Sequence, residues 1–568
     1  MKRIVSIITA LAMTLGVSVS SFATNYDPTL DPIPSGFASI SIGEDAMTQN
    51  NSQIFIQPPA ADENLVRGEW IWCNTLEDPA CDYSNPKNDI MGWAILPPCE
   101  SEADENCIEP PVISSGGTEV TGVFQGLLST ERTYPANERL KFYEASAPSI
   151  FRVPGVIHGG GTDLYMVSAR TSVRYQHSLG HFTTEDLTTS VIPITPEPRT
   201  SGPGPGVFCL QLSPSSCAVP QIFPADVRVR VGVRLADEVG GWFFGRMKDP
   251  LITAAAFSQT NNRVVVEAEP VAVPRLNVKV AQSALTLEDR KAMGNSGSTG
   301  ELGVSDKVYI GTAASDETVF RLIEYFRPWV NDTAAGTTSL WSFKTISNGP
   351  GNQCLADKTQ VLGIVTTNAM GYNGNSPAYV DGFLNYRVAG LHYAPGGKEL
   401  NLGTYDLVMR SETARCLYGF SRAPVSATVS VIGDGGEENV ATTVVSEKDG
   451  WLKLAAYGFT FSEKQIKVRV TQAQSRTLTP FARNATSLTT KQRSEIRAIV
   501  SRGASNPKFI CTGIRLEGQP QAVNTLVRQR AKAACDYAKS LNPRLSTFFQ
   551  TRTTKAASFN GKVLIVSK

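Results

Sequence analysis

The sequence predicts a mainly β, multidomain protein with sandwich-like β units and a C-terminal α/β domain whose elements run β-α-β-α-β. Three observations support this fold class. Runs rich in Val and Thr, broken by Gly, Asn and Pro, extend over most of the 568 residues, and such runs are typical of short strands and turns. Ten cysteines have spacings suited to disulfides. Apolar residues at helical spacing alternate with strand-like runs near the C-terminus.

The N-terminus carries a targeting pattern. Lys2 and Arg3 precede an apolar run over residues 4–19, and Ser21 and Ala23 place small side chains where a signal peptidase cuts. We therefore expect a signal peptide at 1–23 and a secreted protein of the cell wall, cell surface or periplasm. The run is shorter than the roughly 20 apolar residues of a membrane span, and no later stretch is longer, so we expect no transmembrane segment. An uncleaved anchor is the alternative.

The cysteines fit export, because disulfides persist in oxidising compartments. Three pairs share the spacing C-x7-C, each around a polar, turn-rich loop. Metal binding would favour C-x2-C spacing with histidines nearby, and the cysteines show neither feature, so we expect no metal and no cofactor. The expected disulfides join Cys73 with Cys81, Cys99 with Cys107, Cys209 with Cys217, Cys354 with Cys416, and Cys511 with Cys535.

The net charge of +1 hides an uneven distribution. Acids dominate residues 24–110, with a dense acidic run at 100–105. Residues 480–568 contain sixteen Lys and Arg against three acids, a net charge of +13. An asymmetry of this size suggests different partners for the two ends of the chain.

Composition and pattern divide the chain into successive segments after the signal peptide. Residues 226–235 alternate between apolar and polar, which predicts a strand with one buried face. Helices are expected at 286–293, with Thr286 as the cap, and at 316–326, before Pro328. The expected segments are an irregular acidic one at 24–65, a disulfide-bonded β-rich region at 66–280, a mixed segment with short helices at 281–345, a β-rich unit at 346–422, a small Ig-like β-sandwich at 423–474 and the C-terminal domain at 475–568.

The C-terminal segment combines both periodicities. Thr489 and Gln492 form a capping-box pattern that predicts a helix over the following residues. A second helix is expected at 522–540, with small apolar residues on one stripe. After a linker at 475–480, strands are expected at about 478–482, 508–513 and 562–567.

These residues resemble the OmpA C-terminal family, the peptidoglycan-associating domain of bacterial envelopes. Residues 481–488 are similar to its F-x-x-x-x-x-x-L motif, in which a strand leads into the first helix. Gly513 falls at the glycine of the family's glycine-x-threonine-aspartate turn. Arg530 and Ala531 match the arginine-alanine pair of the second helix, which residues 524–537 resemble. The match covers about 90 residues, a sixth of the chain.

The resemblance implies binding of the peptidoglycan stem peptide. In the family, an arginine and an aspartate hold the carboxylates and amine of diaminopimelate. Arg530 matches that arginine, and a guanidinium suits a bidentate carboxylate contact. Leu516 stands where the family has the aspartate, with Glu517 beside it, and this departure argues against the family's full binding pair. The implied ligand-binding residues are Arg530, Glu517, Gly513 and Asn524.

Charge offers a second way to hold the wall. A net charge of +13 over residues 480–568 would attract anionic wall polymers such as teichoic acids or peptidoglycan carboxylates, with screening by salt. A third use of the domain is self-assembly without contact to the wall. Because we expect the chain to be exported, we expect no nucleic acid partner.

The histidines offer little to an enzyme. His177 and His181 have the i, i+4 spacing of a zinc pair on a helix, yet the glutamate of H-E-x-x-H is absent and Gly180 disfavours a helix. His158 and the three glycines after it are similar to an oxyanion loop. Without a G-x-S-x-G elbow, this pattern favours a turn. We therefore expect no enzymatic activity.

Aromatic side chains are the remaining candidates. Exposed aromatic faces stack on polysaccharides, although in β proteins such residues more often fill the core. The candidates for a sugar-binding platform are Trp70, Trp72, Trp93, Trp242, Phe243, Trp329 and Trp341.

Together these features support a functional hypothesis. We expect a secreted envelope protein that is held non-covalently to the wall by its basic C-terminal domain. Its β domains would be displayed as an adhesin or surface-layer element. The alternative is a secreted polysaccharide-binding protein or hydrolase that uses the same wall attachment.

Overall fold

The computed structural model describes most of the chain after the N-terminal segment. The predicted signal peptide at 1–23 and Cys209 lie outside the described residues. No helix in the described ranges is long and apolar enough to cross a membrane. The described residues are 35–44, 51–57, 70–128, 133–198, 210–213, 216–236, 239–294, 307–310, 313–314, 318–345, 353–355, 360–380, 383–418, 425–433, 438–439, 442–461, 464–472, 474–502 and 508–567.

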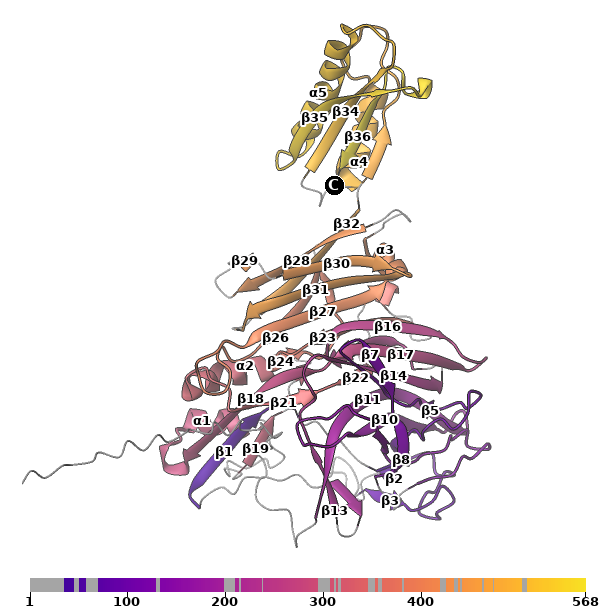
Figure 1. The fold of residues 1–568 in the computed structure, drawn as a ribbon, viewed down its shortest axis with the longest axis vertical. Helices are drawn as coiled ribbons and strands as arrows, with labels where there is room; N and C mark the ends of the chain where they lie inside the picture. Colours follow the sequence, from indigo (N-terminus) through magenta and orange to yellow (C-terminus); the bar gives the residue numbers. More distant parts are fainter. Residues whose placement is uncertain are drawn as a thin grey trace, which may run out of the picture.

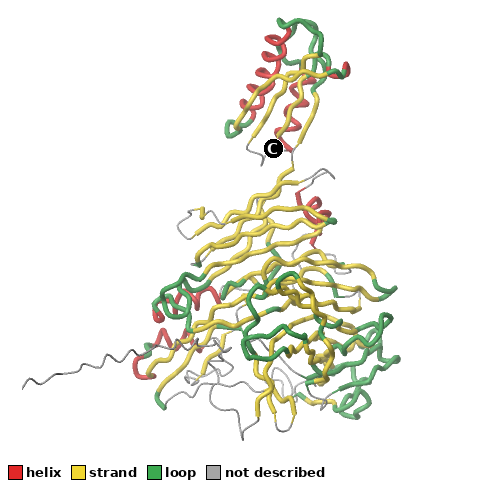
Figure 2. The backbone as a smooth tube through the Cα atoms, viewed as in Figure 1, coloured by secondary structure: helices red, strands yellow, loops and turns green. Residues whose placement is uncertain are grey.

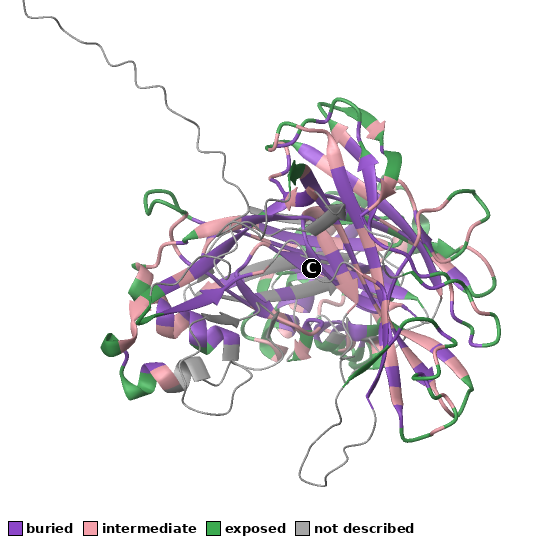
Figure 3. Cartoon of the chain, turned by 90° about the horizontal axis from the view of Figure 1, so that it is seen from below, coloured by how far each residue is buried: buried purple, intermediate pink, exposed green. Residues whose placement is uncertain are grey.

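The described residues form a β-rich body and a small α/β domain at one end of its long axis (Figure 1). Within the described ranges the strands make up five sheets. Most helical residues lie in the small domain and at one flank of the body (Figure 2). Buried strands occupy the interior and exposed loops the periphery (Figure 3). The predicted class, mainly β with several sheets, is confirmed at this level.

One large sheet runs through the whole body. It has 15 strands among the described residues. Its main path is β3 (Ile71–Cys73), β2 (Gln53–Gln57), β4 (Asp89–Ile95), β10 (Leu164–Gln176), β11 (His181–Pro198), β22 (Ser342–Thr345), β15 (Gly241–Arg246), β23 (Val361–Thr367), β27 (Leu402–Arg410), β31 (Trp451–Thr460) and β30 (Thr442–Lys448), with β8 (Val123–Leu127), β9 (Ser149–Arg152), β12 (Leu210–Ser213) and β13 (Ser216–Pro220) joined beside it.

Two further sheets pack against the large one. The first contains β16 (Lys248–Ala256), β17 (Asn261–Glu269), β14 (Val227–Ala236), β6 (Val112–Ser115), β7 (Thr118–Thr121) and β5 (Cys107–Ile108). The second contains β20 (Ala313–Ala314), β24 (Gly371–Asn373), β26 (Phe383–Ala389), β32 (Lys464–Gln472), β28 (Val425–Gly433), β29 (Glu438–Asn439) and β25 (Ala378–Val380).

The centre of the large sheet is buried on both faces. In β15, Phe243 packs into the core shared with β14 and β17, whereas its neighbours Trp242 and Phe244 pack into the core shared with β26 and β32. Strands covered on both sides have continuous apolar runs instead of alternation, and every residue of β15 and β23 is buried. The body is therefore three β layers deep at this point.

Strand β14 shows the opposite pattern and confirms the alternation predicted at 226–235. Val229, Val231 and Val233 lie in the core. Arg228 and Arg230 alternate with these valines, point outward and each form an ion pair with Glu267 of the neighbouring strand. One face of this strand is therefore apolar and the other is covered by paired charges.

A fourth sheet closes the flank of the body. It contains β19 (Lys307–Ile310), β1 (Phe37–Ile42), β18 (Val271–Ala281) and β21 (Gly336–Leu340). Helices α1 (Leu287–Gly294) and α2 (Thr318–Phe326) follow the predicted ranges. The Thr286 hydroxyl accepts a hydrogen bond from the Asp289 amide at 3.2 Å, so Thr286 caps α1 as expected. Short 3-10 helices lie at Gln282–Ala284, Arg327–Val330 and Gln353–Leu355, and α3 spans Ser411–Tyr418.

The prediction that residues 24–65 are irregular is wrong for the part that the structure describes. Strand β1 pairs with β18 along its whole length, and β2 pairs with both β3 and β4. Ile40, Ile42 and Ile54 have no exposed surface. These strands are short and flanked by turn-forming residues, so their partners, which lie far away in the sequence, stabilise them.

The expected boundaries at 280, 345 and 422 do not separate independent units. Strand β15 pairs in parallel with β23 across the boundary at 345. Residues 423–474 do not form an Ig-like sandwich of their own, because β31 joins the large sheet through β27 and β32 joins the outer sheet through β26. Backbone pairing between distant segments therefore makes the body one continuous structure.

Four disulfides lie among the described residues, and they join pairs that the spacing predicts. They are Cys73–Cys81, Cys99–Cys107, Cys354–Cys416 and Cys511–Cys535. Cys217 is also disulfide-bonded. Disulfides persist in oxidising compartments, which fits an extracytoplasmic protein.

The small domain packs helices α4 (Thr490–Arg502) and α5 (Val523–Leu541) on one face of a four-stranded sheet. The sheet order is β33 (Gln474–Thr477), β36 (Val563–Ser567), β34 (Lys508–Leu516) and β35 (Ser546–Thr554). The predicted cap at Thr489 is present, since its hydroxyl accepts from the Gln492 amide at 3.2 Å. A short 3-10 helix at Ala557–Phe559 precedes β36.

Two expectations for this domain need correction. The first strand is β33 at 474–477, in the place of the expected linker and before the expected strand at 478–482. The domain also has a strand that the predicted β-α-β-α-β order lacks, because β35 follows α5 and pairs in parallel with β34. Strand β35 is a mostly exposed edge strand rich in Thr, with Gln550 and Arg552, so it lacks the apolar alternation by which strands are recognised.

Candidate functional site

Arg530, the residue expected to bind a stem peptide, is almost fully buried on α5. Its exposed fraction is 5%. The Nε–H donates to the Ala485 carbonyl and a terminal N–H donates to the Ala482 carbonyl, each at 2.8 Å. The guanidinium also lies 5.1 Å from the centre of the Phe481 ring. Burial without a carboxylate partner lowers the pKa of Arg530, and its contacts hold the loop that leads into α4.

The other three implied ligand residues lie apart from these contacts. Gly513 allows α5 to approach β34, because a Cβ there would lie 2.1 Å from the Val527 carbonyl oxygen. The Glu517 carboxylate is exposed and lies 3.9 Å from the Lys555 ammonium. Asn524 belongs to the first turn of α5, where its amide donates to the Gln521 carbonyl. Arg530 contacts the loop that leads into α4, whereas Glu517 contacts Lys555 after β35.

The strongest electrostatic feature of the small domain is its unbalanced positive charge. The acids Glu495, Glu517 and Asp536 each lie within an ion pair, with Arg476, Lys555 and Lys532 respectively. Several exposed basic side chains on the helices, strands and loops of the domain lie outside these three ion pairs. They are Arg483, Lys491, Arg493, Arg497, Lys508, Arg528, Lys539, Arg544 and Arg552.

The face of this sheet opposite the helices is partly open. Phe548 on β35 is 60% exposed, and a hollow of about 320 Å³ lies beside β34 and β36. Apolar and polar side chains alternate in its lining. They are Ile510, Thr512, Ile514, Gln550, Arg552, Thr554, Phe559, Leu564 and Val566.

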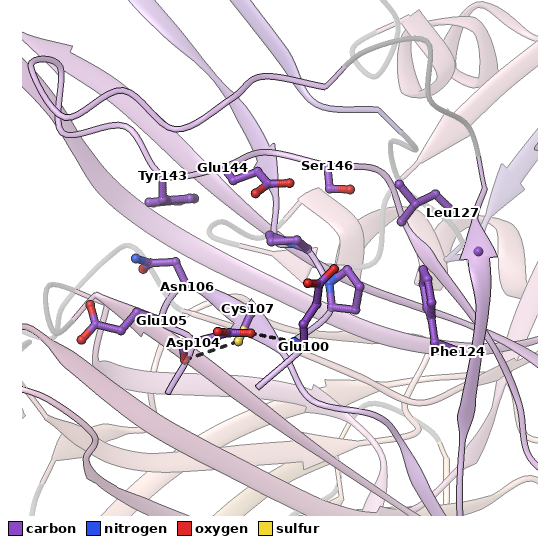
Figure 4. Close-up of a pocket in the computed structure, with 13 residues that line it drawn as sticks. Glu100, Asp104, Glu105, Asn106, Cys107, Phe124, Leu127, Tyr143, Glu144 and Ser146 are labelled. Carbon is purple, nitrogen blue, oxygen red and sulfur yellow. Dashed lines mark hydrogen bonds between the residues drawn. The ribbon is translucent and has the colours of Figure 1, made fainter. Parts of the chain in front are cut away.

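A larger pocket of about 590 Å³ lies in the body beside the Cys99–Cys107 disulfide. Figure 4 shows Tyr143, Glu144 and Ser146 along one side of it and the acidic disulfide loop along the other. Asp104 maintains the loop, because its carboxylate accepts from the amides of Glu100 and Ser101 at 2.7 Å. Hydrogen bonds from Ser101 are the main cause that lowers the pKa of Asp104.

The pocket has an acidic character that favours cations over anions. Glu100 and Glu105 come from the acidic run that the sequence shows, whereas Glu144 and Phe124 come from segments that no pattern singled out. Tertiary packing alone brings these segments together. Among the described residues, no group of three or more His, Cys, Asp or Glu side chains could hold a metal ion.

The histidines have structural contacts. His177 and His181 flank the turn between β10 and β11, where His177 contacts the Asn88 carbonyl and His181 the Leu179 carbonyl. His158 is buried, and burial lowers its pKa. Its Nδ1 accepts from the Gly160 amide at 3.1 Å. The residues 158–161 therefore form a turn, as expected.

The aromatic candidates fall into distinct groups. Trp242, Phe243 and Trp341 are core residues with at most 3% exposure. Trp329 is 37% exposed on the 3-10 helix after α2. By contrast, the tryptophans at 70, 72 and 93 cluster around one phenylalanine, Phe55, at the β3 edge of the large sheet.

Comparison with known proteins adds little. No family model matches the chain, and no curated protein matches it. Among solved structures, the OmpA-like domain of FopA1 from Francisella tularensis subsp. tularensis SCHU S4 is similar, with 18% sequence identity and a TM-score of 0.14. The similarity covers 16% of this chain and 71% of that chain. These values are too low to support an argument, so function must be inferred from the residues of this chain.

Proposed function

We propose that this chain is a non-enzymatic, secreted envelope protein held non-covalently to anionic wall polymers by its C-terminal domain. The domain would have an OmpA-like arrangement, and the β-rich body would be displayed outward as an adhesin or surface-layer element. One observation carries the proposal. Residues 480–568 have a net charge of +13, and each of their three acids already has a basic neighbour.

The OmpA-like arrangement is supported by local features. A strand leads into α4 through Phe481, whose ring packs against Arg530. Gly513 lies where α5 crosses β34 at a distance that excludes any side chain. Both features occupy the positions at which the sequence resembles the family.

The attachment we propose is electrostatic and does not depend on specific binding of the peptidoglycan stem peptide by Arg530. Two nitrogens of Arg530 donate hydrogen bonds to backbone carbonyls. Leu516 stands at the position where the OmpA-like family has its ligand-binding aspartate. The exposed cations on α4, α5 and the adjoining loops instead form a field that attracts polyanions such as teichoic acids or peptidoglycan carboxylates. Such a field is screened within about 10 Å at 0.1 M salt and about 3 Å at 1 M.

The test is co-sedimentation of the mature full-length protein with purified cell-wall sacculi over a salt series. We compare wild type with a variant that has lost four exposed cations of the small domain, Lys491→Gln, Arg528→Gln, Arg544→Gln and Arg552→Gln. The matched control loses four exposed cations of the body through Lys87→Gln, Arg139→Gln, Arg321→Gln and Lys398→Gln.

We expect the first variant to bind sacculi at least tenfold more weakly at 0.1 M salt, and the control to bind like wild type. Wild-type binding should fall steadily towards 1 M salt. An equal loss of sacculus binding in both variants, or binding that does not change with salt concentration, would contradict the proposal. Absence of sacculus binding together with concentration-dependent oligomers would favour self-assembly instead.

A further inference from the structure

An exposed aromatic cluster lies at the β3 edge of the large sheet. Trp70 and Trp72 are 45% and 42% exposed. The Trp70 ring stacks on Phe55, with centroids 4.2 Å apart and planes 11° apart. Phe55 is 1% exposed, so it supports one face of the Trp70 indole and leaves the other side available to solvent.

The second tryptophan presents another apolar surface nearby. The ring centroids of Trp70 and Trp72 are 6.2 Å apart, and their planes meet at 57°. Trp72 lies directly across the strand pair from Phe55. Cys73, the next residue, is fixed by its disulfide to Cys81 and by the Tyr134 hydroxyl, which donates to its carbonyl at 2.8 Å. The two indoles are therefore held before any ligand arrives, which lowers the entropic cost of binding.

The same face of the sheet becomes polar at β4 and β10, two and three strands away from Trp72 on β3. Phe55 pairs with Met91 of β4, and Met91 pairs with Arg174 of β10. Arg174 forms ion pairs with Asp89 and with Glu185, the latter at 2.9 Å. These three side chains are 33%, 40% and 43% exposed, so planar donors and acceptors lie beside the aromatic surface.

We propose that this face, made of Trp70, Trp72 and the Arg174 cluster with Asp89 and Glu185, binds a neutral, hydroxyl-rich polysaccharide chain. A sugar ring offers polarised C–H groups on its face, which the negative face of an indole attracts. It offers hydroxyl groups at its rim, which carboxylates and a guanidinium bind. The site therefore matches both surfaces of a glycan.

The charges argue for a neutral chain. Arg174 is paired with two carboxylates, so this face carries no excess of positive charge that would attract a polyanion. A standard protein interface needs about 800 Å² on each partner with an apolar centre, whereas two indoles and an adjoining charged row form a narrower, mixed surface. The inference is independent of the wall attachment proposed for the C-terminal domain.

The test is native affinity electrophoresis of the mature full-length protein in gels containing hydroxyethyl cellulose, laminarin or glycol chitin. At least one of these neutral polysaccharides should retard the wild type, with little change between 0.05 and 0.5 M salt. The double variant Trp70→Ala/Trp72→Ala should bind at least tenfold more weakly. The matched control is Trp329→Ala, which removes a tryptophan of similar exposure, 37%, elsewhere on the body.

Two further variants keep the test decisive if the double variant folds poorly. Trp70→Phe retains an aromatic face and should retain binding within about threefold, because stacking on Phe55 is preserved. Arg174→Met removes the guanidinium and leaves the Asp89 and Glu185 carboxylates without their shared partner, so it should weaken binding at least fivefold. No retardation by any of the three polysaccharides, equal loss in Trp329→Ala, or a Trp70-dependent dimer in their absence would each overturn the proposal.

Discussion

Replacing Arg530 separates a structural role from a ligand-binding role. In wild type its guanidinium donates two hydrogen bonds of 2.8 Å to the Ala482 and Ala485 carbonyls and stacks on Phe481. A hydrogen bond from a charged donor contributes about 1.5 kcal/mol or more, and the cation–π contact adds about 0.5–1 kcal/mol. Arg530→Ala should therefore lower the free energy of unfolding of the small domain by about 3.5–4 kcal/mol.

The assay is hydrogen exchange by mass spectrometry on the mature full-length protein, read on peptides that cover residues 481–488 and α5. A loss of this size should accelerate exchange by between two and three orders of magnitude, since about 1.4 kcal/mol corresponds to tenfold. Arg528→Ala is the matched control. It removes the same charge from an exposed position of the same helix, where the guanidinium lies 5.6 Å from the centre of the Phe549 ring, and it should change exchange by less than about fivefold.

A conservative variant completes the test. Arg530→Lys keeps the charge, but lysine lacks the planar fork that reaches two carbonyls. We expect it to destabilise the domain and yet to bind sacculi as wild type does at every salt concentration. Unchanged hydrogen exchange in Arg530→Ala, combined with lost sacculus binding in Arg530→Lys, would refute the structural role of Arg530. It would instead support binding of the peptidoglycan stem peptide by Arg530.

Three further outcomes follow from buried groups. Burial raises the pKa of Asp406 to about 6, so its protonation stabilises the fold below the unfolded pKa near 4 and this contribution is lost as pH rises through 6. In chemical denaturation, the stability of wild type relative to Asp406→Asn should fall by about 2 kcal/mol from pH 4 to pH 7, and parallel curves would contradict this. Gly513→Ala places a Cβ 2.1 Å from the Val527 carbonyl oxygen and should cost about 3 kcal/mol in the same assay; wild-type stability would show that α5 moves aside freely. Breaking the Cys511–Cys535 bond, which spans 24 residues, should cost about 3 kcal/mol, seen as faster hydrogen exchange in α5; unchanged exchange would assign the bond no stabilising role.

Local signals in the sequence predicted local structure well. Thr286 and Thr489 each cap a helix, because a threonine hydroxyl three residues before the bonded amide satisfies that amide without help from the rest of the chain. The alternation at 226–235 gives β14 one apolar face and one charged face. The cysteine pairs 73/81 and 99/107 were also predicted correctly, because a short loop keeps its two ends close together whatever the rest of the chain does.

Predictions that depended on distant partners were less successful. Strand β1 is stabilised by β18, more than 200 residues away, and no pattern within residues 37–42 reveals that partner. Strand β35 was not predicted, because an edge strand is exposed on much of its surface and its sequence therefore lacks apolar alternation. Segment boundaries placed by composition missed the parallel pairing of β15 with β23.

The candidate site shows the same division. Charge is a property of residue types, so the positive C-terminal domain is visible in the sequence alone. Whether an arginine faces a ligand or the protein depends on what packs around it, and Arg530 is bonded to two carbonyls of a loop that lies almost 50 residues earlier. Among the tryptophans, Trp341 is 1% exposed and Trp70 is 45% exposed. Residue type sets what each side chain is able to bind, and the packing of distant strands sets which of them solvent and ligands can reach.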